Sequence, residues 1–189
     1  HRYSSAASDV YKRQEEGFHG AKFMIEEGVL DGVDRAFAIH AFTNMPSGMI
    51  TTKDGAIMAS ADRFEITIHG EGGHASAPHQ CADPIPAMAS TITGLHTMVG
   101  RSIEATQSGL VTVAHVEAGT TNNIIPHQAW MEGTIRAHDE HTRETLQNNI
   151  SRVAEGNAAA HGCTCTTNVT PGYPVTILSL IHISEPTRH

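Results

Sequence analysis

The chain has 189 residues, with 12 Lys and Arg against 20 Asp and Glu, which gives a formal net charge of −8 when histidine is neutral. This acidic balance disfavours binding to nucleic acid or to an anionic membrane surface, and no apolar run approaches the length of a membrane span. Its three cysteines, Cys81, Cys163 and Cys165, form no disulfide framework. A cytoplasmic location is therefore expected, although a signal peptide upstream of the chain stays open.

The two ends of the chain contain sequences that one DNA segment can encode on opposite strands. Residues 9–14 (DVYKRQ) can be spelled GAT GTG TAT AAG AGA CAG, and the reverse complement of that spelling encodes residues 178–183 (LSLIHI). Such an inverted repeat resembles the transposon end that is used to tag sequencing libraries. We therefore interpret residues 1–14 and 178–189 as adapter-like, non-native sequence that makes no specific contacts. The first segment carries +2 and the second carries 0, so residues 15–177 carry −10.

The first part of the remaining chain predicts a short helix, a strand and a connector. Residues 19–30 place apolar side chains at helical spacing, and residues 34–42 (DRAFAIHAF) predict a short buried strand. Residues 49–61 predict a connector into the next domain. Within the strand, a lone His40 is more often a packed core residue than a ligand.

Two adjacent carboxylates, Glu15 and Glu16, precede the predicted helix. Taken alone, such a pair is most often a solvated surface feature. On an extended stretch, however, the two side chains point to opposite sides. One of them could then bind a metal while the other removed a proton from a metal-bound water. Together with His40 at a strand end, the pair indicates a metal site.

The second part of the chain predicts a complete α+β domain. Alternating apolar residues or apolar runs predict four strands, and Asp83 and Asp139 are candidate caps for two helices. The order βαββαβ is that of the split ferredoxin-like fold, in which both helices cover one side of an antiparallel sheet. The expected strands cover residues 62–69, 109–117, 127–137 and 163–170, and the expected helices cover residues 83–100 and 139–160.

Three polar residues of this domain are candidates for chemistry. His74 lies in the glycine-rich stretch GEGGHASAPH, where the backbone can approach a ligand closely. The alternative is a mobile hairpin with an idle histidine. Asn123 lies in a predicted turn and Arg136 at the end of the following strand, and together they could hold a carboxylate. The alternatives are a turn residue that tolerates positive φ and an exposed salt-bridge partner.

These motifs together resemble the family of hippurate hydrolases and N-acyl-amino-acid amidohydrolases, within the wider group of di-metal peptidases that includes aminoacylase and glutamate carboxypeptidase. The resemblance covers essentially all of residues 15–177. It implies a ferredoxin-like lid and dimerisation domain over residues 61–172, flanked by pieces of an α/β zinc-peptidase-type catalytic domain at residues 15–60 and 173–177. The motifs that carry it, in order, are Glu15-Glu16, Ala38-Ile39-His40, Gly70 to His79 with Asp83-Pro84, Asn123-Ile124-Ile125-Pro126 and Gly133-Thr134-Ile135-Arg136.

The resemblance also implies the metal chemistry. Two divalent ions, zinc or manganese, are expected in the intact parent protein, with Glu16 and His40 as ligands and Glu15 as the general base. The family's upstream ligand motif and its last histidine ligand have no counterpart in this chain. Because Glu16 and His40 supply only two ligands, fewer than the three usual at a catalytic zinc, the chain alone is expected to be inactive.

The same resemblance assigns roles to the three lid residues. His74 is expected to stabilise the tetrahedral intermediate, and Asn123 and Arg136 to bind the carboxylate of an N-acyl amino acid or a small peptide-like substrate. The resemblance further implies a homodimer through the lid domain, with His74 acting on substrate held by the other subunit.

Two other functions remain as alternatives. The first is a non-catalytic homodimerisation module. The second is a ferredoxin-like RNA-binding domain, which is disfavoured by the net charge and by an aromatic content of only 5%, since such domains stack bases on aromatic side chains.

Overall fold

The computed structural model describes residues 20–34 and 38–179 of the chain. They divide into two units, with the boundary between Thr51 and Thr52. In the described part of the first unit, the chain forms one helix, α2 (Gly20–Glu26), followed by turns. Several large apolar side chains of this unit are exposed, among them Ile25 and Ile39. So small a unit has little apolar surface of its own against which to bury them.

The strand that we predicted over residues 34–42 is wrong for the residues described there. Residues 34 and 38–42 form no strand, and their side chains are exposed, including 85% of Ile39. A buried strand requires neighbours that satisfy its backbone on both sides. Within the described residues, no strand pairs with this segment, so its apolar pattern is not sufficient to make it one.

The second unit is built on a four-stranded antiparallel sheet. Its strand order is β4-β6-β2-β7, so that the first strand lies between the third and the fourth. This order confirms the predicted ferredoxin-like arrangement, and each strand starts or ends within three residues of the predicted limit. The strands are β2 (Ala61–His69), β4 (Gly109–Ala118), β6 (Gln128–Ala137) and β7 (Thr164–Tyr173).

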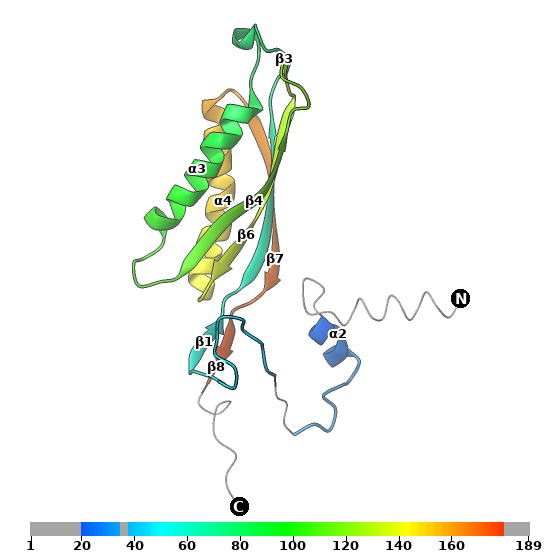
Figure 1. Cartoon of the computed structure of the whole chain (residues 1–189), viewed down its shortest axis with the longest axis vertical. Helices are drawn as coiled ribbons and strands as arrows, with labels where there is room; N and C mark the ends of the chain where they lie inside the picture. Colours follow the sequence, from blue (N-terminus) through cyan, green and yellow to red (C-terminus); the bar gives the residue numbers. More distant parts are fainter. Residues whose placement is uncertain (1–19, 35–37, 180–189) are drawn as a thin grey trace, which may run out of the picture. The chain divides into compact units, whose positions relative to one another are not determined.

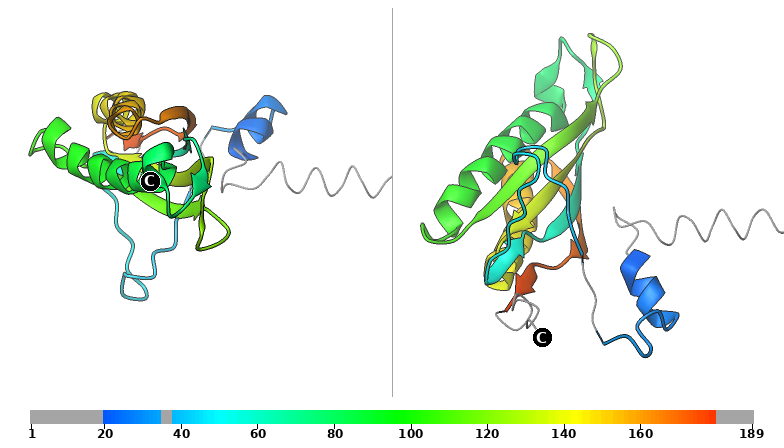
Figure 2. Two further views of the ribbon diagram at one scale, coloured as in Figure 1. Left: turned by 90° about the horizontal axis from the view of Figure 1, so that it is seen from above. Right: turned by 60° about the horizontal axis from the view of Figure 1, so that its bottom comes forward.

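Two helices, α3 (Pro84–Ser102) and α4 (Glu140–Ala160), lie side by side on one face of this sheet (Figure 1; Figure 2). Both begin at the predicted caps. Asp83 accepts a hydrogen bond from the backbone N–H of Ile85 at 2.9 Å, and Asp139 accepts one from Thr142 at 2.8 Å. These bonds satisfy N–H groups that have no partner within the helix.

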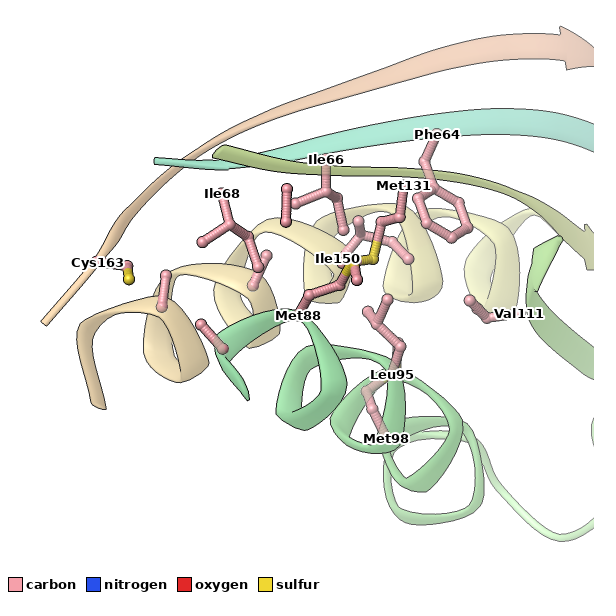
Figure 3. Packing of buried hydrophobic residues seen from close by; sticks show 14 of the residues in the cluster. Phe64, Ile66, Ile68, Met88, Leu95, Met98, Val111, Met131, Ile150 and Cys163 are labelled. Carbon is pink, nitrogen blue, oxygen red and sulfur yellow. The ribbon is translucent and has the colours of Figure 1, made fainter. Parts of the chain in front are cut away.

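The core lies between the sheet and the two helices (Figure 3). Because side chains alternate across a strand, Phe64, Ile66 and Ile68 all point to the helices and are fully buried. Leu95 of α3 and Ile150 of α4 meet them from the other side. The hydrophobic effect over this surface holds the second unit together.

Two of the three cysteines belong to this core. Cys163 is buried and Cys165 is partly buried against the same cluster. Burial raises the pKa of both thiols, so they stay protonated and unreactive at neutral pH. Both side chains therefore belong to the packing of the second unit.

A buried ion pair joins α4 to the end of the sheet at which β2 begins. The guanidinium of Arg143 donates to both carboxylate oxygens of Asp62, at 2.7 and 2.9 Å, and the backbone N–H of Gly172 donates to the same carboxylate at 2.8 Å. Three elements, β2, α4 and β7, therefore meet at one carboxylate.

Two small antiparallel pairs lie at opposite ends of the large sheet (Figure 1). At one end β3 (Gly73–His74) pairs with β5 (Ile124–Ile125), and a short 3₁₀ helix, η1 (Pro78–Gln80), follows β3. At the other end β1 (Gly55–Met58) pairs with β8 (Thr176–Leu178). Neither pair was predicted, because strands of two to four residues carry no readable periodicity.

The pairing of β1 with β8 corrects one expectation. Leu178 pairs with Gly55, although we expected residues from 178 onward to make no specific contact. The reason is local, since a third residue extends the pairing that residues 176 and 177 have already begun. Residues 180–189 lie outside the described residues.

The face of the sheet that the helices leave open is polar. Arg63 donates to Glu132 across the strands at 2.6 Å, and this hydrogen bond holds the pKa of the Glu132 carboxyl below its usual range. His115 and Trp130 stack edge to face beside them. No described helix has the length and apolar character that crossing a membrane requires.

Candidate functional site

The pairing of β3 with β5 brings two of the predicted site residues together. His74 pairs with Ile124, the residue next to Asn123. In addition, the backbone N–H of Ala75 donates to the carbonyl oxygen of Asn123 at 3.0 Å. His74 and Asn123, which are 49 positions apart in the sequence, are therefore joined at one end of the domain, which we call the tip (residues 70–82 and 119–127).

Glycines allow the two halves of the tip to approach each other. A Cβ on Gly72 would lie 2.5 Å from the carbonyl oxygen of Ile125, and a Cβ on Gly70 would lie 2.1 Å from the carbonyl oxygen of Ala82. Because these neighbours are backbone atoms, they could not move aside cheaply. The glycine-rich motif is thus required by close packing of the tip.

Hydrogen bonds hold the same loop in place. Gly70 donates to the carbonyl oxygen of His127 at 2.8 Å, and Gly72 donates to the Nδ1 atom of the His127 ring at 3.2 Å. Glu71 and Ala82 exchange two backbone hydrogen bonds, at 2.8 and 2.9 Å. These hydrogen bonds favour an ordered loop over the alternative of a mobile hairpin.

The ring of His74 is exposed and oriented by its own turn. Its Nδ1 atom lies 2.7 Å from Ser76 Oγ and 3.2 Å from the backbone nitrogen of Ser76. The nearby Asn123 side chain accepts a hydrogen bond from the hydroxyl of Thr121 at 3.1 Å. An imidazole and a carboxamide are thus presented to solvent from the same end of the domain.

A shallow cavity of about 320 Å³ opens beside the tip. Its lining is mostly apolar, with a few polar and charged side chains. It comes from the end of β4, from β5 and from the start of β6, and comprises Glu117, Ala118, Gly119, Thr120, Ile124, Pro126, His127, Gln128 and Trp130.

Arg136 lies far from the tip. It is near the end of β6, opposite Leu110, where its guanidinium donates to the Thr134 hydroxyl and, at 3.0 Å, to the carbonyl oxygen of Ile135. The eight residue-to-residue steps of strand from Gln128 to Arg136 span roughly 26 Å at about 3.3 Å per step. Within one chain, Asn123 and Arg136 therefore do not lie close together, because one extended strand separates them.

The predicted metal residues do not form a metal centre in the described part of the chain. Glu15 and Glu16 lie outside the described residues. His40 is exposed, and its Nδ1 atom lies 2.8 Å from the carbonyl oxygen of Ala41. Between residues 20 and 179, apart from 35–37, no group of three or more His, Cys, Asp or Glu side chains could hold a metal ion. The described residues by themselves therefore do not supply a complete metal site.

Two residues that contact the His74 ring or its loop were not among the candidates from the sequence. Ser76 contacts the ring of His74, and His127 accepts from the loop that carries it. A serine two residues after an exposed histidine was a usable signal for the first, since short polar side chains favour local hydrogen bonds. No local signal connects His127 with Gly72, because 55 positions separate them.

Residues 60–162 match the family model described as the peptidase dimerisation domain. The chain is 44% identical over 153 residues to N-acetylcysteine deacetylase from Bacillus subtilis. This match covers 81% of this chain and 40% of that protein. It is 39% identical over 162 residues to thermostable carboxypeptidase 2 from Saccharolobus solfataricus, covering 85% of this chain and 41% of that protein.

A solved structure gives the same result at the level of the fold. It is a Bacillus subtilis protein described as a dinuclear metal-binding peptidase of the M20 family, with a TM-score of 0.67 and 37% identity. The match covers 86% of this chain and 40% of that one. The chain thus spans about two fifths of the length of the relatives that it matches.

Proposed function

The chain belongs to the peptidase dimerisation domain family, and from this premise we propose that it is the lid and dimerisation part of a metal-dependent amidohydrolase. The proposed parent enzyme cleaves the amide bond of N-acyl amino acids or small peptide-like substrates. The observation that carries the proposal is the tip, where His74 and Asn123 are held together by the pairing of β3 with β5 and by the hydrogen bond from Ala75. The names of the relatives, a deacetylase and a carboxypeptidase, support the substrate class.

In this proposal His74 acts at the reacting carbonyl. Amide hydrolysis passes through a tetrahedral intermediate whose oxygen becomes negative, and an N–H donor aimed at that oxygen lowers the barrier. The exposed ring of His74 can supply such a donor, and Asn123 can bind the substrate beside it. In the intact parent two divalent ions, zinc or manganese, would supply the activated water, with Glu16 and His40 among their ligands and Glu15 as the general base.

The distance between the tip and Arg136 supports a site assembled from two copies. Because roughly 26 Å of strand separates the ends of β6, Asn123 and Arg136 of one chain cannot bind one carboxylate. In a two-fold dimer, Arg136 of one subunit could meet His74 and Asn123 of the partner subunit. The domain would then contribute to catalysis through its dimer, and a purely non-catalytic dimerisation module is the alternative.

The edge strand β4 is the proposed dimer contact. Both β4 and β7 lie at edges of the sheet, and an unpaired edge favours pairing with another chain. Strand β7 contains Pro171, which lacks the N–H needed for pairing. Strand β4 contains no proline, and its Leu110 and Val116 are about half exposed. A copy of the same edge related by two-fold symmetry would cover them.

The test is complementation between two inactive subunits. Residues 15–177 would replace the corresponding segment of the Bacillus subtilis deacetylase, which is 44% identical to this chain, and Glu15→Gln and His74→Ala would be made separately in the chimera. Each variant alone should lose about 10²-fold or more in kcat. If His74 acts across the dimer, mixed dimers of the two variants regain one working site.

The matched control places both substitutions in one subunit and mixes it with the unmodified subunit. Action across the dimer predicts that such a mixed dimer has no working site, whereas action within one subunit predicts that it has one. The proposal fails if the first pair stays inactive although mass spectrometry shows that mixed dimers form.

A further inference from the structure

The turn that carries His74 uses each of its successive backbone donors. The N–H of Ala75 donates to Asn123, the N–H of Ala77 donates to the carbonyl oxygen of His74 at 2.8 Å, and the N–H of Ser76, between them, donates to the His74 ring at 3.2 Å. The imidazole is therefore part of the hydrogen-bonding pattern of the turn.

The direction of these bonds fixes where the ring carries its proton. A backbone N–H can only donate, so the Nδ1 atom that faces Ser76 must accept with its lone pair. The hydroxyl of Ser76 lies 2.7 Å from the same atom and can donate as well. In a neutral imidazole with Nδ1 as acceptor, the single proton is on Nε2.

We infer that Ser76 is a positioning residue: it holds the His74 ring so that the Nε2–H group, on the side of the ring away from the turn, is the donor presented to the substrate. The inference rests on the proposed function of His74. It extends that function by naming the nitrogen that donates and the side chain that selects it.

The serine hydroxyl makes a closer contact with the His74 ring than the backbone N–H of Ser76 does. At 2.7 Å its contact with Nδ1 is shorter than the 3.2 Å contact from the backbone nitrogen, and a hydrogen bond weakens as it lengthens. Without the hydroxyl, the exposed ring could rotate and leave the backbone N–H to water. Ser76→Ala should therefore affect the orientation of the ring and leave the stability of the fold unchanged.

The first experiment reads the ring directly in the full 189-residue chain. In ¹⁵N-labelled protein at about pH 9, where imidazole rings are neutral, two-bond ¹H–¹⁵N correlations distinguish a ring nitrogen with a proton from one without. His74→Gln identifies the signals. We expect an unprotonated Nδ1 and a protonated Nε2 in the unmodified chain, and movement of the two shifts toward each other in Ser76→Ala.

A protonated Nδ1 in the unmodified chain, or ring signals that Ser76→Ala leaves in place, would overturn the inference. The thermal midpoint provides the check on stability. It should be the same for Ser76→Ala as for the unmodified chain, and a loss comparable to that of a core variant would show a merely structural role.

The second experiment measures kinetics in the chimera described above. Ser76→Ala should lower kcat about tenfold with KM within about twofold, since a displaced catalytic group costs up to about 10²-fold. Ser76→Thr keeps the hydroxyl and should restore most of the rate. The control is Ser90→Ala, which removes another serine–histidine contact, 2.9 Å between Ser90 Oγ and His161 Nε2, and should leave kcat unchanged.

The outcomes separate the two proposals. If His74→Ala leaves kcat unchanged, the proposed function fails and the inference fails with it. If His74→Ala lowers kcat by about 10²-fold or more while Ser76→Ala leaves it within twofold of the unmodified chimera, the inference alone is overturned. A loss in Ser76→Ala that threonine restores supports both.

Discussion

At the scale of single residues, Asp62 shows how a buried charge is tolerated. Its side chain is fully buried, and burial alone raises a carboxyl pKa. The hydrogen bonds from Arg143 and Gly172 and the charge of Arg143 outweigh burial, so the pKa of Asp62 lies below its ordinary value of 3.8. The ionised form is therefore the one that the fold stabilises.

This shift predicts how stability depends on pH. Because the folded pKa is lowered, the contribution of Asp62 is complete above the unfolded pKa of about 3.9 and is lost as the pH falls through the lower folded value. Asp62→Asn leaves the Arg143 charge buried without its partner and should lower the free energy of unfolding by about 3 kcal/mol at pH 7. The difference from the unmodified chain should shrink as the pH falls below about 4.

Urea unfolding between pH 3 and pH 7 measures both effects. Asp54→Asn, which changes an exposed carboxylate outside the large sheet, is the control and should stay within about 0.5 kcal/mol of the unmodified chain. A cost for Asp62→Asn that is the same at pH 3 and pH 7 would contradict the role assigned to its ionised form.

At the scale of elements, the tip depends on how closely its strands approach. Strands β3 and β5 have only two residues each, and so short a pair is not stable by itself. It persists because Gly72 packs directly on the backbone of Ile125 and because its N–H donates to the His127 ring. The position of His74 therefore depends on a residue that has no side chain.

Gly72→Ala should loosen the tip without unfolding the domain. The added methyl group would lie 2.5 Å from the carbonyl oxygen of Ile125, and such overpacking costs about 1–3 kcal/mol. Amide protons of residues 73–75 and 124–125 should then exchange at least about fivefold faster, whereas exchange in the core of β2 and β6 should be unchanged.

Gly100→Ala in α3 is the matched control, since its methyl group would meet nothing within 4 Å. Hydrogen–deuterium exchange followed by mass spectrometry reports both variants. Equal exchange at the tip in Gly72→Ala and the unmodified chain would show that the close approach of the strands does not hold His74.

At the scale of the whole molecule, the open edge at β4 determines the expected assembly. The sheet has two edges, and only the β7 edge contains a proline. The family to which the chain belongs is described as a dimerisation domain. The proposed dimer pairs β4 with its own copy and leaves the β7 edge free.

Thr112→Lys should therefore weaken the dimer. Thr112 lies on β4 with its side chain exposed, and two-fold pairing would bring the new charges of both subunits close together, which edge strands use to prevent association. Sedimentation equilibrium should show a dissociation constant raised by at least about tenfold, or 1.4 kcal/mol. Thr164→Lys, an exposed threonine on β7, should leave it unchanged, and the reverse result would place the contact on β7.

The sequence by itself determined the elements of the lid domain and their order. Periodicity and caps are local properties: apolar residues at every second position mark Phe64, Ile66 and Ile68 as one strand face, and Asp83 and Asp139 mark helix starts. The same reasoning failed for the described residues of the predicted strand, 34 and 38–42, where an apolar pattern met no pairing strand. A local pattern indicates which side chains a segment can bury. Whether a neighbouring strand is there to pair with it depends on the rest of the molecule.

Only the tertiary structure decided which site residues meet. His74 and Asn123 are far apart in the sequence and adjacent at the tip, whereas Asn123 and Arg136 are only 13 positions apart and lie near opposite ends of β6. The reason is geometric, because a strand advances by about 3.3 Å per residue while a turn reverses the chain within a few residues. Distance along the sequence therefore says little about distance in the site. The register of the strands determines which site residues lie close together.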